Sequence, residues 1–511
     1  MNQIKIGAAL NYVTILLTNV IGLIMTPFIL NHLGKAEYGI YLTIGALVGT
    51  ISLLDFGLNN TVVRFIAKYK AEKDRKGEEN FLATTMLLYV IISLIAIVLG
   101  VVFYGYMDDY FTKMTKDELK IAKIIFSIFI FNLAIGLPGA AFTGICYGYE
   151  SFVFPKTLNI IRYILRSITV LTVLFLGGKA IQLVIIDSIF NISIIIITAF
   201  FVFKKLKVKI KLHTLSKEFV KHIFSYSVWI FVFSLVGIFQ WKVGHWILGR
   251  IASPEVLSVY GIGIVLGTYY GAFSSAISSV FLPRATKMAV ANVSGEELTS
   301  MMIKIGRISF IILMYILIAF FLFGKQFVFL WVGSELGRDG AYTSWLIALI
   351  IMIGLTIPLI QYFGTSILEA QGRISFKAKI YLLFLIIGTV IGAFFAKQYG
   401  GIGMICGSVS GMVVAQFFLN IYYYRIVNIN ILRFFKEVFN KTFLLLLLVF
   451  GISYFLNYIP GNNWFIFVIR ACIYSLVFIL IMYNLGMIES EKKIFRDPIV
   501  VLLKKIKIIN E

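Results

Sequence analysis

Apolar stretches long enough to cross a bilayer follow one another along the whole chain, and this feature constrains the fold most. A membrane-spanning helix needs about 20 apolar residues. Of the 511 residues, 60% are hydrophobic and 14% are charged, and the mean hydropathy is +0.94. A water-soluble domain carries about 25% charged residues. The sequence therefore predicts an all-α polytopic membrane protein and excludes folds that need a large soluble catalytic domain.

Charged residues and Gly/Pro clusters divide the chain into predicted helices. The first apolar run, from Ile6 to Leu30, is too long for a signal peptide, so we expect it to remain as a helix. Fourteen spans are predicted, near 6–31, 38–66, 81–105, 119–147, 156–177, 179–203, 218–249, 256–283, 298–323, 341–368, 376–396, 401–424, 434–457 and 463–487.

The distribution of basic residues predicts the orientation. The chain has 46 Lys plus Arg against 24 Asp plus Glu, a net charge of +22. An even number of spans places both termini on one side, and 34 of the 46 basic residues fall on that side. Because cytoplasmic loops carry the excess of Lys and Arg, we expect both termini in the cytoplasm and a chain in the cytoplasmic membrane. The charge then needs no nucleic acid to explain it.

An ordered series of matches at an offset of about 220 residues indicates an internal repeat. Two six-helix copies entering the membrane in the same direction are typical of transporters that rock one lobe against the other. The matched pairs include Gly34 and Gly249, Tyr41 and Tyr260, Arg64 and Arg284, Pro138 and Pro358, Ser151 and Ser375, and Gly177 and Gly400.

The repeat sets the predicted domains. They are an N-terminal six-helix lobe at 1–210, a second six-helix lobe at 211–428, two additional helices at 429–488 and a basic cytoplasmic tail at 489–511. Pro138 and Pro358 fall in corresponding fourth helices, where a missing backbone donor permits a kink. We predict a hinge there, with ordinary helix packing as the alternative.

Several motifs resemble those of the polysaccharide repeat-unit flippases (Wzx-type) of the multidrug, oligosaccharidyl-lipid and polysaccharide exporter superfamily. They are Thr26-Pro27-Phe28-Ile29-Leu30, Leu33-Gly34-Lys35, Glu37-Tyr38-Gly39-Ile40-Tyr41, Leu54-Asp55-Phe56-Gly57-Leu58, Ile247-Leu248-Gly249-Arg250 and Phe281-Leu282-Pro283-Arg284. The resemblance implies two helix bundles that flip an undecaprenyl-pyrophosphate-linked oligosaccharide for surface polysaccharide biosynthesis. Many relatives have an acidic and then a basic residue where this chain has Gly244 and His245. Any role that this acidic residue has in the relatives therefore cannot be assigned to this chain.

Basic residues inside predicted spans are candidates for binding an anionic substrate, because an ionisable group in a bilayer normally faces a partner or an aqueous cavity. Lys242 and His245 share one helix with Trp241, which could stack on sugars. Arg162 and Arg166 are four residues apart and can present both guanidinium groups to a phosphate. The alternative for these cations is snorkelling to the headgroups. Arg64 and Arg284 are predicted cytoplasmic anchors that could also meet the diphosphate, and Arg250 is predicted to be interfacial.

Acidic and amide residues inside predicted spans are candidates for coupling to an ion. Asp55 has Asn59 four residues later, on the same helix face, and Asp187 interrupts an apolar run in the sixth helix. Either carboxylate could hold a coupling proton or sodium ion, or could simply hydrogen-bond to neighbouring helices.

No GxxxxGK[ST] loop occurs, so an ion gradient, the membrane potential or substrate mass action must drive transport. The cysteines Cys146, Cys406 and Cys472 lie in apolar runs without metal-binding spacing, and we expect no metal and no cofactor.

The expected partners are the lipid-linked oligosaccharide, membrane lipids and a polysaccharide polymerase, and we expect the chain itself to be a monomer. The alternatives are an ion-coupled multidrug-type exporter of the same superfamily and a membrane-embedded polymerase or glycosyltransferase. The enzyme would need a larger polar loop than those expected near 106–118 and 324–341.

Overall fold

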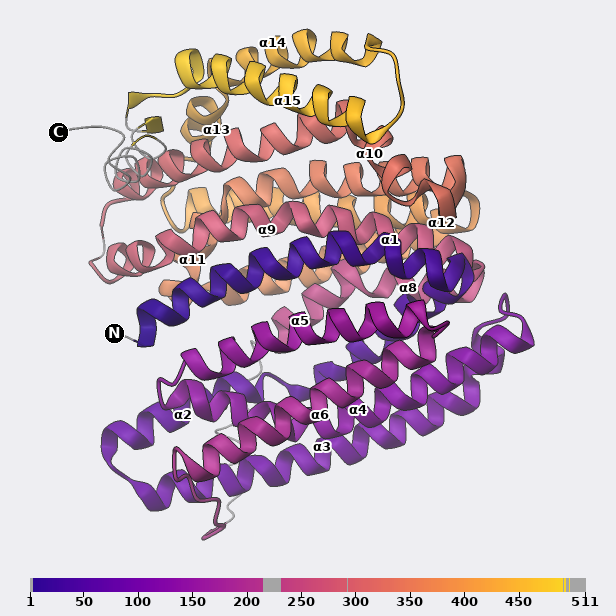
Figure 1. Ribbon diagram of the computed structural model, residues 1–511. Helices are drawn as coiled ribbons and strands as arrows, with labels where there is room; N and C mark the ends of the chain where they lie inside the picture. The colour runs from indigo at the N-terminus through magenta and orange to yellow at the C-terminus, as the bar shows by residue number, and fades with distance from the viewer. Residues whose placement is uncertain (1–2, 215–230, 292, 490, 493–495, 497–511) are drawn as a thin grey trace, which may run out of the picture. The chain divides into compact units, whose positions relative to one another are not determined.

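The chain is an all-α polytopic membrane protein (Figure 1). The computed structural model describes residues 3–214, 231–291, 293–489, 491–492 and 496, and no strand occurs among them. The elements are α1 (Gln3–Ile51), η1 (Ser52–Asp55), α2 (Leu58–Glu72), α3 (Arg75–Tyr110), α4 (Lys116–Gly148), α5 (Val153–Phe175), α6 (Ala180–Lys204), the helix Phe231–Trp241, α8 (Val243–Ile251), α9 (Pro254–Val290), α10 (Gly295–Ile360), α11 (Tyr362–Ala370), α12 (Ile374–Arg425), α13 (Ile431–Phe439), α14 (Thr442–Tyr454), η2 (Phe455–Tyr458), α15 (Trp464–Ile481) and η3 (Met482–Gly486).

Nine helical segments of the described chain are long and apolar enough to cross a membrane, or ten if one bent pair counts as a span. Three long elements, α1, α10 and α12, each contain one glycine with non-helical dihedrals. These glycines, Gly34, Gly337 and Gly400, fall between predicted spans. Each element is therefore two helices joined at a glycine, which is consistent with the fourteen predicted spans without establishing that number.

The breaks at Gly34, Gly337 and Gly400 have φ values of 76°, 73° and 55°. Glycine reaches this left-handed region without the steric cost that a Cβ brings. One such residue replaces a loop, so the loop expected near 324–341 is wrong: α10 continues to Gly337 and resumes after it. The loop expected near 106–118 is shorter too, because α3 runs to Tyr110 and α4 begins at Lys116. Gly177, the repeat partner of Gly400, is also left-handed, with φ 85°.

Among the described residues, four predicted spans are interrupted. The span predicted at 38–66 breaks at Phe56 and Gly57, which are both left-handed, between η1 and α2. The span predicted at 341–368 breaks at Gln361, three residues after Pro358, where α10 gives way to α11. The span predicted at 434–457 breaks at Asn440 and Lys441, between α13 and α14. The span predicted at 218–249 begins outside the described residues and breaks at Lys242, between the helix Phe231–Trp241 and α8.

The chain divides into two compact units. The first comprises 1–265, 334–347 and 375–412, and the second comprises 266–333, 348–374 and 413–511. This division is by compactness, and the lobe boundaries expected from the repeat stay a prediction. In the first unit α4 packs against both α3 and α6 (Figure 1). A buried core there includes Leu58, Phe81, Tyr89, Leu137 and Ile145.

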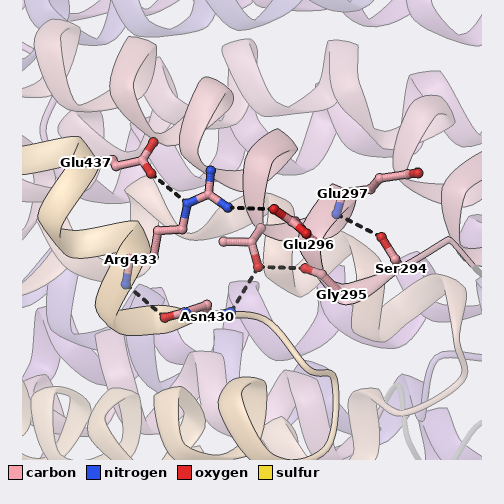
Figure 2. A network of polar contacts seen from close by, with 8 residues as sticks. Ser294, Gly295, Glu296, Glu297, Asn430, Arg433 and Glu437 are labelled. Atoms are coloured by element: carbon pink, nitrogen blue, oxygen red, sulfur yellow. Dashed lines mark hydrogen bonds and ion pairs between the residues drawn. The ribbon is translucent and has the colours of Figure 1, made fainter.

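In the second unit, polar contacts near helix ends join α13 to α10. Figure 2 shows Arg433 of α13 between Glu437, at 2.6 Å, and Glu296 of α10, at 3.5 Å. Asn430 caps α13 by accepting from the backbone N–H of Arg433, and its own backbone N–H donates to Thr299. These contacts hold the short helix α13 against the start of α10.

The outward faces of the long helices are apolar. Leu94, Val98 and Val101 on α3 are exposed, as are Val390 and Phe394 on α12. In water such surfaces would mark an interaction site, whereas in a bilayer they contact acyl chains. The burial pattern therefore agrees with the membrane assignment made from hydropathy.

Candidate functional site

A cavity of about 450 Å³ lies inside the first unit, among α1, η1, α4, α5 and α6. Glycines from two helices, Gly45 and Gly49 of α1 and Gly136 of α4, form part of its wall, and the absence of side chains there leaves space between helices. The other lining residues are Val48, Ser52, Phe129, Asn132, Leu133, Arg162, Tyr163, Arg166, Asp187, Phe190 and Asn191. Three of the charged residues singled out in the sequence thus line one cavity.

Arg166 and Asp187 form an ion pair in the cavity wall. Nε of Arg166 lies 2.5 Å from Oδ1 of Asp187, and Nη2 lies 3.0 Å from Oδ2. The hydroxyl of Tyr41, on α1, donates to the same carboxylate at 3.3 Å. The side chains of Arg166 and Asp187 are 21% and 22% exposed. Two parallel N–H···O bonds fix the geometry of this ion pair, which connects α5 to α6. The hydrogen bond from Tyr41 connects α1 to the same carboxylate.

Arg162 lines the same cavity one helical turn before Arg166. Among the described residues no carboxylate pairs with it, and its guanidinium lies 5.5 Å from the ring of the adjacent Tyr163. The side-chain amide of Asn191, on α6, donates to the amide oxygen of Asn132, on α4, at 2.6 Å. These two side chains add neutral polar groups to the cavity lining. The lining therefore carries one positive charge in excess, because Asp187 offsets only one of the two arginines.

Lys242 reaches the edge of this cavity from a break between two helices. The helix Phe231–Trp241 and α8 meet there at an angle of 40°. Nζ of Lys242 donates to the carbonyl oxygen of Gly49 at 2.8 Å, and Gly49 lines the cavity. That carbonyl lies in the last turn of α1, before η1, where the helix dipole favours a cation. Lys242 thus adds a second positive charge at the wall.

The structure does not bring His245 or the neighbouring tryptophans to this cavity. His245 is buried, and its ring packs edge to face on Tyr260 with centroids 5.0 Å apart. The sequence suggested that Lys242 and His245 lie on much the same helix face, but the helix breaks at Lys242 and only Lys242 contacts the cavity wall. Trp246 lines a different cavity with Arg250, and Trp241 is half-buried outside the lining.

Asp55 and Asn59 lie at the break between η1 and α2, not in the cavity lining. The Oδ1 atoms of both are buried and have no hydrogen-bond partner among the described residues. The hydroxyl of Tyr89, on α3, lies beside Asp55. A carboxylate just before a helix start is stabilised by that helix's dipole, so a structural role for Asp55 is as consistent with this position as an ion-binding role.

The remaining candidates lie elsewhere. Arg64 is exposed on α2, and Arg284 lies in α9 with a side chain outside the described part of the chain. Pro138 lies inside α4, which continues unbroken, whereas Pro358 precedes the break at Gln361. Among the described residues no group of three His, Cys, Asp or Glu side chains could hold a metal ion.

Several site residues are not singled out by the sequence, among them Tyr41, Gly49 and Asn132. Tyr41 stands in a family motif and in the repeat, and Gly49 and Asn132 carry no signal of their own. Tyr41 follows Tyr38 by one turn in an apolar helix, a spacing that fits packing equally well. Only the packing of α1 against α5, α6 and α8 identifies Tyr41 and Gly49 as parts of the site.

The chain matches a family of known proteins over most of this unit. Residues 5–290, more than half of the chain, match the family described as polysaccharide biosynthesis protein. A protein of Shigella flexneri described as an O-antigen transporter is 21% identical over 379 residues, which cover 74% of this chain and 87% of that protein.

Solved structures share the fold. The lipid II flippase MurJ, in an inward closed conformation, has a TM-score of 0.68 at 14% identity over 97% of this chain and 100% of that chain. An inward-facing multidrug resistance MATE family transporter of the MOP superfamily has a TM-score of 0.62 at 16% identity, over 79% of this chain and 92% of that chain. At such identities the likeness shows the fold alone.

Proposed function

Because the chain belongs to the polysaccharide biosynthesis protein family, we propose that it is a flippase for a lipid-linked oligosaccharide. The proposed substrate is an undecaprenyl-pyrophosphate-linked repeat unit, moved from the cytoplasmic to the outer leaflet of the cytoplasmic membrane by alternating access. The product would serve surface polysaccharide biosynthesis, with a polymerase acting on it outside the cell. The chain itself would perform transport and no covalent chemistry.

The positive excess of the cavity carries this proposal. Arg162 lines it without a carboxylate partner among the described residues, and Lys242 holds its ammonium at Gly49 in the same wall. Placing an arginine inside a membrane helix costs about 2.5–3.5 kcal/mol on insertion scales. A pyrophosphate would compensate this cost, because guanidinium groups bind phosphate oxygens through two parallel hydrogen bonds. Arg162 would therefore be the main anchor.

Arg166 has a different part in the proposal. Its two hydrogen bonds to Asp187 occupy Nε and one Nη, so it presents less of its guanidinium to a ligand than Arg162 does. We assign Arg166 to positioning, with Asp187 and Tyr41 fixing it. Asn132 and Asn191 would offer hydrogen bonds to sugar hydroxyls beside the phosphate subsite.

A multidrug-type cation exporter is the second candidate. It is favoured by the half-buried carboxylate of Asp55, whose buried Oδ1 atom lacks a partner among the described residues. A cation exporter needs acidic groups in the substrate cavity, yet the carboxylate of Asp187 is paired there and Arg162 is in excess. In the flippase, we propose that Asp55 couples transport of the lipid-linked oligosaccharide to a proton or sodium ion, with Asn59 as a second oxygen donor.

Loss of the gene in its source cells tests the proposal. We expect surface polysaccharide to disappear while undecaprenyl-pyrophosphate-linked oligosaccharide accumulates, with the wild-type gene restoring both. Unchanged polysaccharide together with increased sensitivity to lipophilic cations would favour the exporter instead.

A further inference from the structure

A second cavity, of about 540 Å³, lies in the first unit away from the proposed transport site. Its wall is formed by α1, α3, α4 and α8, near the ends of α3 and α8 that the sequence predicts to be external. Leu99, Val102 and Tyr106 of α3 line it and are 48%, 52% and 63% exposed. Because these side chains belong to the apolar outer face of α3, the cavity opens toward the acyl chains of the bilayer.

Two opposite charges line this apolar cavity without pairing with each other. Asp109 and Arg250 are both exposed, and neither forms an ion pair with any described residue. The preceding residue, Asp108, is paired with Lys123. Asp109 therefore differs from its neighbour in forming no ion pair within the described part of the chain, although an arginine lines the same cavity.

Arg250 is held in place by its surroundings. Its guanidinium carbon lies 6.0 Å from the ring of Tyr110, and the hydroxyl of Tyr110 donates to the carbonyl of Trp246 at 3.1 Å. The hydroxyl of Thr112 donates to the carbonyl of Arg250 itself at 3.2 Å. These bonds fix the end of α3 to α8, so the fold brings Asp109 and Arg250 into the lining of one cavity.

We infer that this cavity binds one membrane phospholipid with a zwitterionic phosphoethanolamine headgroup. Arg250 takes the phosphate, Asp109 takes the ammonium, and an acyl chain lies along Leu99 and Val102. The lining offers one anionic and one cationic side chain, as the headgroup carries one ammonium and one phosphate, and the apolar wall suits the acyl chain. This lipid is a structural ligand of the protein, independent of what is transported.

Other occupants fit less well. Phosphatidylglycerol has a phosphate for Arg250 but no cation for Asp109. A polyprenyl pyrophosphate brings two phosphates and no cation, so Asp109 would repel it. A lipophilic cation would be repelled by the positive charge of Arg250. The zwitterion alone satisfies both groups.

Native mass spectrometry of the purified full chain tests the inference with phosphatidylethanolamine and phosphatidylglycerol of matched acyl chains. We expect the wild type to retain phosphatidylethanolamine with an affinity on the order of tenfold higher than phosphatidylglycerol, as one charge-assisted hydrogen bond supplies. Asp109→Asn should abolish this preference while leaving phosphatidylglycerol binding unchanged. Arg250→Gln should weaken both lipids.

Asp108→Asn and Lys113→Gln serve as matched controls, because each removes one charge of the same sign near the same helix end without altering the cavity lining. Both should bind as the wild type does. Equal retention of the two lipids by the wild type, or an Asp109→Asn variant that keeps the preference, overturns the inference. Displacement of phosphatidylethanolamine by equimolar undecaprenyl pyrophosphate also overturns it, since the cavity would then belong to the transported lipid.

Discussion

Arg166 on α5 donates two hydrogen bonds to the carboxylate of Asp187 on α6, at 2.5 and 3.0 Å. The sequence suggested that one residue binds phosphate and the other an ion. Because they hold each other, neither charge is free to act alone. Their pairing leaves Arg162 as the cavity-lining arginine with no carboxylate opposite it among the described residues.

The ion pair of Arg166 and Asp187 should contribute to the free energy of unfolding, and a double-mutant cycle measures this contribution. Removing one member of a buried ion pair costs about 3–5 kcal/mol, because the other charge stays buried and unpaired. Since each side chain is about a fifth exposed, we expect the lower end of that range for Arg166→Gln and for Asp187→Asn. The double variant should recover most of the loss. Thermal unfolding of the detergent-purified chain measures it.

The ion pair of Lys123 and Asp108 provides the comparison, because its carboxylate is 57% exposed and pairs open to solvent contribute about 0–1 kcal/mol. Asp108→Asn should leave the unfolding temperature almost unchanged. Additive losses in the Arg166 and Asp187 double variant would contradict the account.

Moving the Lys242 ammonium without removing its charge should also impair transport. A Cβ added at Gly49 would overlap Nζ of Lys242, which is the flexible end of the side chain and can shift away. We expect Gly49→Ala to fold normally and to lower the rate of surface polysaccharide formation. Lys242→Ala should abolish it, and Lys242→Arg should retain part.

Gly45→Ala is the matched control for Gly49→Ala. Gly45 lines the same cavity on the same helix, but a Cβ there would meet only Phe129, at an ordinary 3.8 Å. Equal effects of the two alanine variants would show that cavity space matters and the position of Lys242 does not.

Asp55 should determine the energy source. Asn keeps the shape and hydrogen bonding of Asp but cannot exchange a proton, so Asp55→Asn separates coupling from folding. In reconstituted vesicles we expect the variant to bind the lipid-linked oligosaccharide and to lose the response of transport to an imposed pH difference. A parallel sodium gradient distinguishes the two ions. Asp339→Asn, at an exposed position, should respond as the wild type does.

A variant Asp55→Asn that still responds to every gradient as the wild type does would assign Asp55 to structure. A wild type that responds to neither gradient would remove the need for a coupling residue.

The predicted orientation has its own test. A reporter active only in the cytoplasm should be active when fused after Lys211 or Glu511 and silent when fused at Asp109 or Gly461, because the basic loops lie on the first side. Activity at Asp109 would reverse the whole topology, since successive loops alternate from it.

Much of the helix pattern was predictable because the bilayer imposes length and hydropathy on every span. The turns at Gly34, Gly337 and Gly400 fall where the sequence placed span boundaries. The interruption at Lys242 was not predictable, because no proline or glycine occupies that position to mark it. The loop near 324–341 was overestimated because charged residues around Gly337 resemble a loop, although one left-handed glycine suffices.

The candidate site was predictable only in part. The four-residue spacing of Arg162 and Arg166 predicts that both face one side, and both line the cavity. The partner of Arg166 depends on how α5 packs against α6, which no local pattern encodes. The contact of Lys242 with Gly49 joins residues 193 positions apart in the chain and required the fold.

Translocation of undecaprenyl-pyrophosphate-linked oligosaccharide in proteoliposomes tests the central claim most directly, that the excess arginine of the cavity binds the pyrophosphate. We expect the wild type to exceed empty vesicles, Arg162→Gln to lose on the order of tenfold in rate through the lost charge-assisted bonds, and Arg162→Lys to keep part of it. Lys120→Gln, an exposed control, should match the wild type. A wild type no faster than empty vesicles, or an Arg162→Gln variant as fast as the wild type, would contradict the claim.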